Sequence, residues 1–319
     1  MPRSKGGNGN GNGRRRKHPP KTSEKEMVQA AKASDWEAES KRGRLLLVAT
    51  PIGNLGDITF RAIATLKEAA AIACEDTRVT RKLLDRYGIA TELTPYHEHN
   101  AAKARPRLLA RLKAGETIAL VTDAGTPLVS DPGYKLVQAV VAEGIPFTAL
   151  PGPSAVLAAL LLSGLPPDRF FFGGFLPAKA EARRREIESL GGFPATLVFF
   201  ESAKRLPATL RQMAEHLGRR PAAVVREATK LYEEVRRGDV ARLAEIYERE
   251  GPPKGEVVIV LGPPEAAAAE DREAEAEKLL PAALRRSSLR DAVDAVAAGT
   301  GLSRRRVYAL ALALTKRNA

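Results

Sequence analysis

The chain has 319 residues, of which 44% are hydrophobic, and its 51 Lys and Arg against 38 Asp and Glu give a formal net charge of +13. This length predicts two domains with room for a small third module, and the hydrophobic fraction excludes a wholly disordered chain. A single cysteine, Cys74, excludes an intramolecular disulfide framework and a cysteine-rich zinc site, and no apolar run reaches the roughly 18–20 residues that span a bilayer. We therefore expect a soluble, cytoplasmic protein that does not cross a membrane.

The positive charge is concentrated at the two ends of the chain. Residues 1–44 contain 12 Lys and Arg against 5 Asp and Glu, residues 281–319 contain 8 against 2, and residues 45–280 are formally neutral. Such a distribution predicts a polyanionic partner that the ends contact, and the alternative is that the basic ends only aid solubility. The Gly- and Asn-rich segment 1–44 has no apolar periodicity, so we expect a disordered basic tail.

Short apolar segments and helical segments alternate between residues 45 and 165. Strands are predicted at 45–49, 71–75, 116–123 and 146–152, and helices at 58–70, 81–87, 134–142 and 154–164. In the last of these helices, Ser154 is placed to cap the start and Gly164 to cap the end. This alternation is typical of an α/β domain with a parallel sheet, which we assign to 45–165.

A second α/β domain is expected at 166–264. Strands are predicted at 169–175, 196–202, 222–227, 231–238 and 255–262, with helices at 179–190, 203–217 and 239–250. The alternation of side chains within 231–238 indicates at least one antiparallel strand. The following segment, 265–280, is rich in Ala and Glu without a strong apolar face, so it is expected to be a helical or flexible linker.

Three loops that follow predicted strands, at 50–59, 123–133 and 150–155, are rich in Gly and Pro. Ligands of open α/β sheets bind beyond the carboxyl ends of the strands, glycine lets a ligand approach the backbone, and proline fixes the shape of a loop. We expect these loops to hold a bulky, mostly neutral ligand, and the alternative is that they are ordinary turns. The sequence has neither a Walker A motif nor a G-x-G-x-x-G motif, which argues against a P-loop or a dinucleotide site.

Charged side chains follow one of these strands closely. Glu75, Asp76 and Arg78 come at the end of 71–75, where polar groups line a crevice rather than a core. His97 and His99 lie two residues apart and could face the same way as metal ligands. We favour instead a histidine that hydrogen-bonds a substrate or orients a neighbour, and we assign no metal.

Two further motifs, FESAKR at 200–205 and VREATK at 225–230, place charges four residues apart. Glu201 and Arg205 are four residues apart, as are Arg226 and Lys230. Taken alone, each motif is more typical of a surface salt-bridge set than of a functional site.

Over about residues 45–262 the chain resembles a known family in its ordered motifs TPIGNLGDIT, ACEDTRVTRKLL, YHEHN, ALVTDAGTPLVSDPG, LPGPSA, SGLP, FFGGFLP, FFES, RE-TK and KGE. They resemble the ribosomal RNA small-subunit methyltransferase I branch of the tetrapyrrole methylase superfamily, which methylates a cytidine 2′-hydroxyl of 16S ribosomal RNA. The resemblance implies two α/β domains with S-adenosylmethionine in the cleft between them. It also implies the small ribosomal subunit as partner and a homodimer.

The resemblance implies roles for individual residues. The cofactor-binding positions would be Pro51, Gly53, Asp123, Ala124, Gly125, Thr126, Pro127, Val129, Ser130, Asp131, Pro151, Gly152 and Ser154. In the reaction that the resemblance implies, Arg78, Arg205, Arg226 and Lys230 would hold RNA phosphates or pair with the acids of the Glu75 and Asp76 cluster.

Residues 281–319 resemble the small helix-turn-helix-like module of many family members. Leu289, Val293 and Val296 fall on one helix face, and a second helix is expected to begin at Ser303. That helix carries three consecutive basic residues that we expect to contact RNA, namely Arg304, Arg305 and Arg306. The alternative is a packing or dimerisation module with a solvated basic face.

A ribose hydroxyl is a poor nucleophile until it loses its proton, so the implied reaction needs a proton acceptor. Glu75, Asp76, His97 and Asp123 are candidates, and we favour the Glu75 and Asp76 cluster with His97 assisting. Two other functions stay open: methylation of a ring carbon of a tetrapyrrole, and a non-catalytic RNA-binding or ribosome-assembly factor that uses the same fold.

Overall fold

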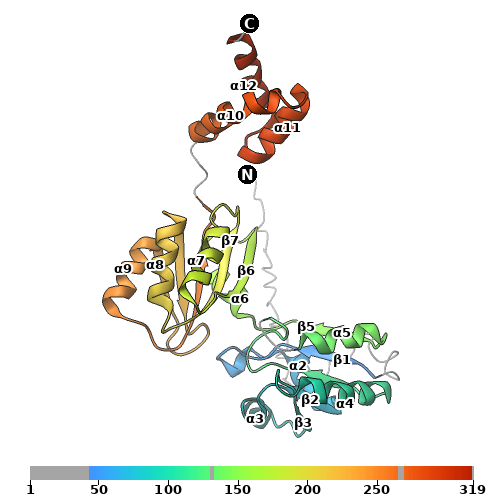
Figure 1. Ribbon diagram of the computed structural model, residues 1–319. Coiled ribbons are helices and arrows are strands. Elements are labelled where there is room, and N and C mark those ends of the chain that lie inside the picture. Colours follow the sequence, from blue (N-terminus) through green and yellow to red (C-terminus); the bar gives the residue numbers. More distant parts are fainter. Residues whose placement is uncertain (1–42, 130–132, 265–268, 318–319) are drawn as a thin grey trace, which may run out of the picture. The chain divides into compact units, whose positions relative to one another are not determined.

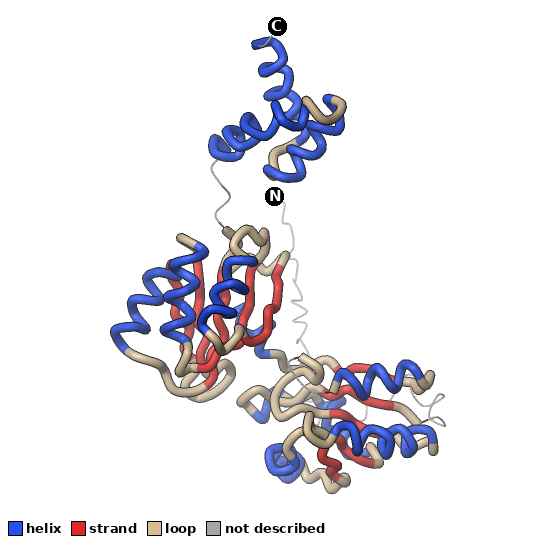
Figure 2. The backbone as a smooth tube through the Cα atoms, viewed as in Figure 1, coloured by secondary structure: helices blue, strands red, loops and turns tan. Residues whose placement is uncertain are grey.

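The structure is a computed structural model that describes residues 43–129, 133–264 and 269–317. Two compact α/β units are followed by three C-terminal helices (Figures 1 and 2). The first unit runs to Pro51 and from Leu55 to Pro153, and the second contains Ile52–Asn54 and the chain from Ser154. The expected tail up to residue 42, and the expected cofactor residues Ser130 and Asp131, lie outside the described residues.

The first unit is built around a sheet of five strands in the order β3-β2-β4-β1-β5. All neighbouring strands are parallel, so the parallel α/β fold predicted from the alternating pattern is confirmed. The elements in chain order are β1 Leu45–Val48, η2 Leu55–Asp57, α2 Phe60–Glu68, β2 Ala71–Cys74, α3 Thr77–Arg86, β3 Leu93–Pro95, α4 Ala101–Lys113, β4 Ile118–Leu120, α5 Tyr134–Ala142 and β5 Phe147–Leu150.

Helices cover both faces of this sheet. Leu46 and Val48 of β1 belong to the core formed with α2 and α3, whereas Leu45 and Leu47 belong to the core formed with α4 and α5. Successive side chains of a strand point to opposite faces, so a strand buried on both sides must be apolar at every position. Because the strands are parallel, their carboxyl ends all emerge at one edge of the sheet, where the Gly- and Pro-rich loops begin.

Three elements of the first unit differ from the sequence-based expectation. Helix α3 begins at Thr77, before the expected start at residue 81, because the Asp76 side chain accepts a hydrogen bond from the N–H of Arg78 at 2.8 Å and caps the helix. The pattern also does not indicate β3 or α4. Strand β3 has only three residues, and α4 contains Pro106 and many basic residues that obscure its apolar spacing.

The second unit contains a mixed sheet in the order β6-β7-β10-β8-β9. Strand β10 is antiparallel to β7 and β8, and β9 is antiparallel to β8, so the antiparallel strand expected at 231–238 is confirmed with shifted bounds. The elements are α6 Ala155–Ser163, β6 Phe170–Phe175, α7 Ala180–Ser189, β7 Thr196–Ser202, α8 Leu206–Leu217, β8 Pro221–Arg226, β9 Glu234–Asp239, α9 Val240–Glu250 and β10 Glu256–Leu261.

Helices α7, α8 and α9 form the main core of the second unit with its sheet, while α6 packs against β8 and β10. The expected caps of α6 are confirmed: Ser154 accepts a hydrogen bond from the Leu157 N–H at 3.4 Å, and Gly164 ends the helix with a φ of 72°. Because α6 packs on the second sheet, the second unit begins at Ser154, before the helix, whereas we expected a boundary at residue 165.

The C-terminal helices α10 Ala269–Leu284, α11 Leu289–Thr300 and α12 Arg304–Arg317 form their own small core (Figure 1). Much of the segment 265–280, expected as a linker, is therefore part of α10, whose Ala276 and Leu280 are fully buried. Val293 and Val296 of α11 are buried as predicted. The predicted start of the second helix is also confirmed, because Ser303 accepts a hydrogen bond from the Arg306 N–H at 3.3 Å.

Candidate active site

Three loops of the first unit are held together at the carboxyl edge of its sheet. Thr50, after β1, forms an isolated antiparallel bridge with Gly125, with N···O distances of 2.9 and 3.0 Å. The Thr50 hydroxyl also donates to the Thr122 carbonyl oxygen at 3.0 Å, and the Thr126 hydroxyl donates to that of Pro153 at 3.1 Å. The loops after β1, β4 and β5 therefore meet, as expected for a ligand site at this edge.

The loop after β4 has a strained backbone. Gly125 has a φ of 83°, and Leu128 has a φ of 74°, which is uncommon for a residue with a Cβ atom. Residues with strained backbone conformations are frequent at ligand-binding sites, where surrounding contacts hold them in place. At the neighbouring turn, a Cβ atom on Gly152 would lie 2.9 Å from the Cβ of Ala49, so only glycine lets these two loops approach.

An open groove beside these loops is lined by all four candidate proton acceptors. It has a volume of about 440 Å³ and is lined by Glu75, Asp76, Thr77, Arg78, Pro95, His97 and Asp123. Its walls come from the ends of β2, β3 and β4, which are neighbours in the sheet. The volume lies within the range of small-molecule sites, so the groove could accept a nucleoside-sized group.

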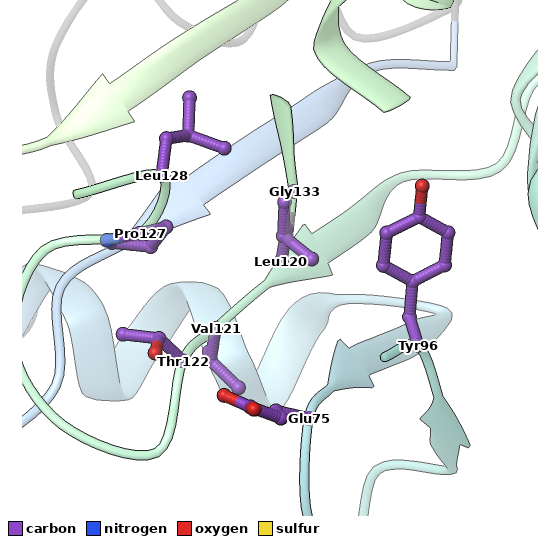
Figure 3. A pocket seen from close by; sticks show the side chains of 8 residues that line it. All are labelled: Glu75, Tyr96, Leu120, Val121, Thr122, Pro127, Leu128 and Gly133. Carbon is purple, nitrogen blue, oxygen red and sulfur yellow. The ribbon is translucent and has the colours of Figure 1, made fainter. Parts of the chain in front are cut away.

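A second, much smaller cavity shares Glu75 with the groove (Figure 3). Its volume is about 10 Å³, close to what one water molecule requires. It is lined by Glu75, Tyr96, Leu120, Val121, Thr122, Pro127, Leu128 and Gly133. This cavity is too small for a cofactor.

Charges around the groove differ in their environment. The side chain of Arg78 donates hydrogen bonds to both carboxylate oxygens of Asp76, and the backbone N–H of Arg78 donates to Oδ1. These hydrogen bonds lower the pKa of Asp76 to about 2. Burial raises the pKa of the Cys74 thiol at the end of β2. Burial likewise raises the pKa of Tyr96, although the neighbouring Arg105 partly offsets that effect.

His97 follows β3 and lines the groove. Its backbone N–H donates to Oδ1 of Asn100 at 2.9 Å, which fixes the start of the following turn. Its Nδ1 atom is buried and has no hydrogen-bond partner among the described residues. The rings of His97 and His99 lie 6.1 Å apart between centroids, and the described residues contain no group of three or more potential metal ligands.

The basic residues expected to contact RNA in the two units are paired with acids. Arg205 pairs with Glu201, which is fully buried, and Arg226 pairs with Glu234 at 3.0 Å. Lys230 lies 2.8 Å from Glu227 and 2.9 Å from Glu256. Of the four cations, Arg78 pairs with an acid of the Glu75 and Asp76 cluster, at 2.7 Å from Asp76, and the other three pair with different acids. Their contact with RNA stays a prediction.

The three arginines of α12 have different surroundings. Arg304 pairs with Asp294 of α11, and Arg306 pairs with Glu273 of α10. Arg305 is exposed and makes no ion pair with the described residues. All three side chains are exposed, and two of them join helices of the module through ion pairs, whereas Arg305 forms none with the described residues.

The remaining expected cofactor residues take different positions. Pro51 and Pro127 are buried, whereas Ala124, Thr126, Pro151 and Gly152 are exposed at the edge of the sheet and Val129 and Ser154 are half-buried. The structure adds Thr50, Tyr96 and Leu128, which the site residues predicted from sequence do not include. Thr50 and Tyr96 stand inside the quoted motifs TPIGNLGDIT and YHEHN, but a Leu with positive φ leaves no signal in a sequence.

Comparison with known proteins agrees with this architecture. Residues 44–244 match the model of the tetrapyrrole (corrin/porphyrin) methylases, and residues 270–315 match that of an RsmI C-terminal HTH domain. The latter match includes most of α10, in agreement with the small core that α10 shares with α11 and α12. Within the part of the chain that the structure describes, no helix is long and apolar enough to cross a membrane.

Several relatives carry the same name. The chain is 55% identical over 237 residues to ribosomal RNA small subunit methyltransferase I of Mesorhizobium japonicum, covering 74% of this chain and 80% of the relative. It is 49% identical over 280 residues to the protein of that name from Erythrobacter litoralis, covering 88% and 98%. A solved structure of diphthine synthase has a TM-score of 0.55 and 18% identity, covers 69% of this chain and 90% of its own, and shows the shared fold. The chain belongs to the tetrapyrrole methylase family, within its ribosomal RNA small subunit methyltransferase I branch.

Proposed function

We propose that this chain transfers the methyl group of S-adenosylmethionine to the 2′-hydroxyl of a cytidine ribose in 16S ribosomal RNA of the small ribosomal subunit. The observation that carries this proposal is the groove at the ends of β2, β3 and β4, where Glu75 and His97 lie beside the cofactor loops of a methyltransferase family. The names of the relatives favour ribosomal RNA over a tetrapyrrole substrate. Such a substrate is consistent with a reaction in the cytoplasm.

The three joined loops fit S-adenosylmethionine. This cofactor is a sulfonium with a nucleoside and an amino acid end, and it carries no phosphate, so it needs no P-loop. Ala124, Thr126, Pro151 and Gly152 are exposed at the edge of the sheet, and Gly125 and Leu128 have left-handed backbone conformations there. We assign the holding of the cofactor to these residues, with Asp123 at their start.

The groove residues would prepare the hydroxyl. The bound cofactor supplies an electrophilic methyl group that leaves a neutral thioether behind. A carbon–oxygen bond would form as the carbon–sulfur bond broke, and the hydroxyl proton would pass to a base of this chain. We assign that base to Glu75 or His97, because Asp76, with a pKa of about 2, accepts a proton too weakly. Asp76 instead caps α3 and orients Arg78.

The basic ends of the chain would dock the RNA. In the C-terminal module, Arg305 has a charge that no described acid neutralises, so we assign it a phosphate contact. Arg304 and Arg306 would act through the packing of the module. Removing residues 1–44 and 265–319 should weaken RNA binding and its salt dependence while leaving the affinity for S-adenosylmethionine unchanged.

We also propose a homodimer. Leu157 and Leu161 on α6 are 50% and 75% exposed, which is consistent with a face that a second copy covers. Light scattering of the full chain measures this directly: a monomer at micromolar concentration would contradict the proposal.

The reaction is tested by mapping 2′-O-methylation on small-subunit RNA from a strain that lacks this gene. One cytidine should lose its methyl group and regain it when the wild-type chain is supplied. Calorimetry with S-adenosylmethionine separates the enzyme from a scaffold: a chain that binds no cofactor and restores no methyl group would favour a non-catalytic assembly factor.

A further inference from the structure

Two large apolar side chains project from a turn between β8 and β9. Leu231 is 89% exposed and Tyr232 is 68% exposed. Exposed apolar residues are common when they are scattered, but two adjacent ones at the tip of a turn are informative when the turn itself is held in place.

The contacts of the turn show that it is held firmly. The ammonium group of Lys230 lies 2.8 Å from Oε1 of Glu227 and 2.9 Å from Oε2 of Glu256. The Thr229 N–H donates to the Glu233 carboxylate at 2.7 Å. Glu227 and Thr229 have φ angles of 50° and 67°, which residues with a Cβ atom adopt only where surrounding contacts over-determine the backbone.

The turn is also packed against the first of the loops expected to hold the cofactor. A Cβ atom on Gly53 would lie 2.3 Å from Cγ of Lys230 and 2.8 Å from its Cε, so the stem of Lys230 lies directly on the Gly53 backbone. The segment Ile52–Asn54 belongs to the second unit together with this turn. Leu231 and Tyr232 thus directly follow, in the chain, the residue that packs on Gly53.

We propose that Tyr232, with Leu231 beside it, is a stacking platform for an unpaired nucleobase of the RNA substrate. The proposal rests on the proposed function, because it needs an RNA whose target ribose is brought to the cofactor. Proteins that recognise RNA sequence mostly bind unpaired bases, which they stack on aromatic side chains. The charge of Lys230 is already balanced by Glu227 and Glu256, so the turn is suited to stacking rather than to a phosphate contact.

A protein partner fits this turn less well. An aromatic side chain buries about 150–250 Å². A stable protein interface buries about 800 Å² on each partner. Two side chains at the tip of a turn supply only part of that area, whereas they match the face of a single base.

The test compares Tyr232→Ala with the wild-type full-length chain, using small ribosomal subunits from the deletion strain as the probe. Stacking on one aromatic side chain corresponds to a change of about 10- to 100-fold in affinity, so Tyr232→Ala should weaken RNA binding by that factor. The affinity for S-adenosylmethionine and the rate at saturating RNA should stay within about twofold. Tyr232→Phe and Tyr232→Trp should restore RNA binding, and Leu231→Ala should weaken it less than Tyr232→Ala.

Two features separate stacking from other roles. The loss in Tyr232→Ala should be the same factor at every salt concentration, because stacking releases no counterions. Phe147→Ala is the matched control. Phe147 is 44% exposed at the amino-terminal end of β5, away from the carboxyl edge of its own sheet, so this substitution should leave RNA affinity unchanged.

Unchanged RNA affinity in Tyr232→Ala would overturn the platform. If light scattering gave Tyr232→Ala half the mass of the wild type, the platform would be overturned as well, because the turn would then contact a second copy of the chain. If the wild-type chain itself methylates no ribosomal RNA, the proposed function fails. If the wild-type chain and Tyr232→Ala methylate equally well with equal KM for RNA, only the platform fails.

Discussion

The backbone N–H of Asp76 donates a hydrogen bond to Oδ1 of Asp123 at 3.0 Å. This contact joins the end of β2 to the end of β4, and so connects the groove that holds Glu75 with the loop expected to bind the cofactor. A substitution at either residue should therefore affect both the groove and the cofactor loop.

Asp123→Ala should weaken binding of S-adenosylmethionine and lower the free energy of unfolding by about 1 kcal/mol, the usual value of one hydrogen bond. Asp123→Asn keeps an acceptor oxygen, so its unfolding free energy should stay near that of the wild type. Calorimetry with S-adenosylmethionine and urea unfolding measure the two effects. Equal cofactor affinity in Asp123→Ala and the wild type would remove Asp123 from the binding site.

Removing the base, by Glu75→Gln if it is Glu75 or by His97→Ala if it is His97, should lower kcat about 100- to 10,000-fold, the range of general acid–base catalysis. The affinity for S-adenosylmethionine should change little, because both side chains line the groove rather than the loops. Single-turnover methylation of small subunits at saturating cofactor measures the chemical step. Wild-type rates in both variants would eliminate both residues as the base.

The ion pair of Asp76 with Arg78 predicts a pH dependence of stability. The folded pKa of Asp76 is about 2, below the roughly 3.9 of an unfolded chain. A depressed pKa contributes stability that is complete above about pH 4 and is lost as the pH falls toward 2. Melting temperatures of the wild type and Asp76→Asn should therefore differ most above pH 4 and converge near pH 2. A difference that stays constant over this range would show that the carboxylate charge adds nothing.

Arg205→Ala should destabilise the second unit by about 3–5 kcal/mol, the cost of leaving a buried charge without its partner. Glu201 is fully buried and would keep only the Thr209 hydroxyl and the Ser202 N–H as donors. Arg211→Ala on the same helix is the control, since its pair with Glu248 is exposed and is worth at most about 1 kcal/mol. Similar urea midpoints for the two variants would contradict a structural role for Arg205.

Arg305→Ala should reduce the dependence of RNA affinity on salt by about one phosphate contact, a slope change of about 0.7–0.9. Arg304→Ala and Arg306→Ala should chiefly lower the melting temperature, because they break pairs with Asp294 and Glu273 that join the helices of the module. RNA binding titrated between low and high salt measures the slope. A larger slope change in Arg304→Ala than in Arg305→Ala would reverse this assignment.

Local patterns predicted the parts of the fold that depend on local physics. Strands β1 and β2 are continuous apolar runs because both of their faces are buried, and the caps Ser154 and Ser303 stand where helices begin. Helix α4 left no clear pattern because few of its side chains are buried, and the sparse apolar residues of α10 conceal a face that is buried only when α11 and α12 pack on it.

The candidate site was predicted in part, and for a similar reason. Motifs and resemblance indicate Glu75, His97 and Asp123, which the fold brings to one groove. Glu201 lies four residues from Arg205, so the spacing alone indicated that pair. Whether Lys230 is free to bind a phosphate depends on Glu256 of β10, which the pairing of β10 with β8 brings beside it. The left-handed conformations of Leu128 and Glu227 likewise arise from tertiary contacts, which a linear pattern does not contain.

The packing of Gly53 on Lys230 has a consequence for the order in which the protein is made. The ribosome releases Ile52–Asn54 early, together with the strands of the first unit, but the turn that receives this segment is synthesised only after β8. Domains generally fold as they emerge, amino-terminal first. The first cofactor loop can therefore reach its final packing only after most of the second sheet has been synthesised. A chain truncated before residue 230 would have a folded first unit, but Gly53 would lack the side chain on which it packs.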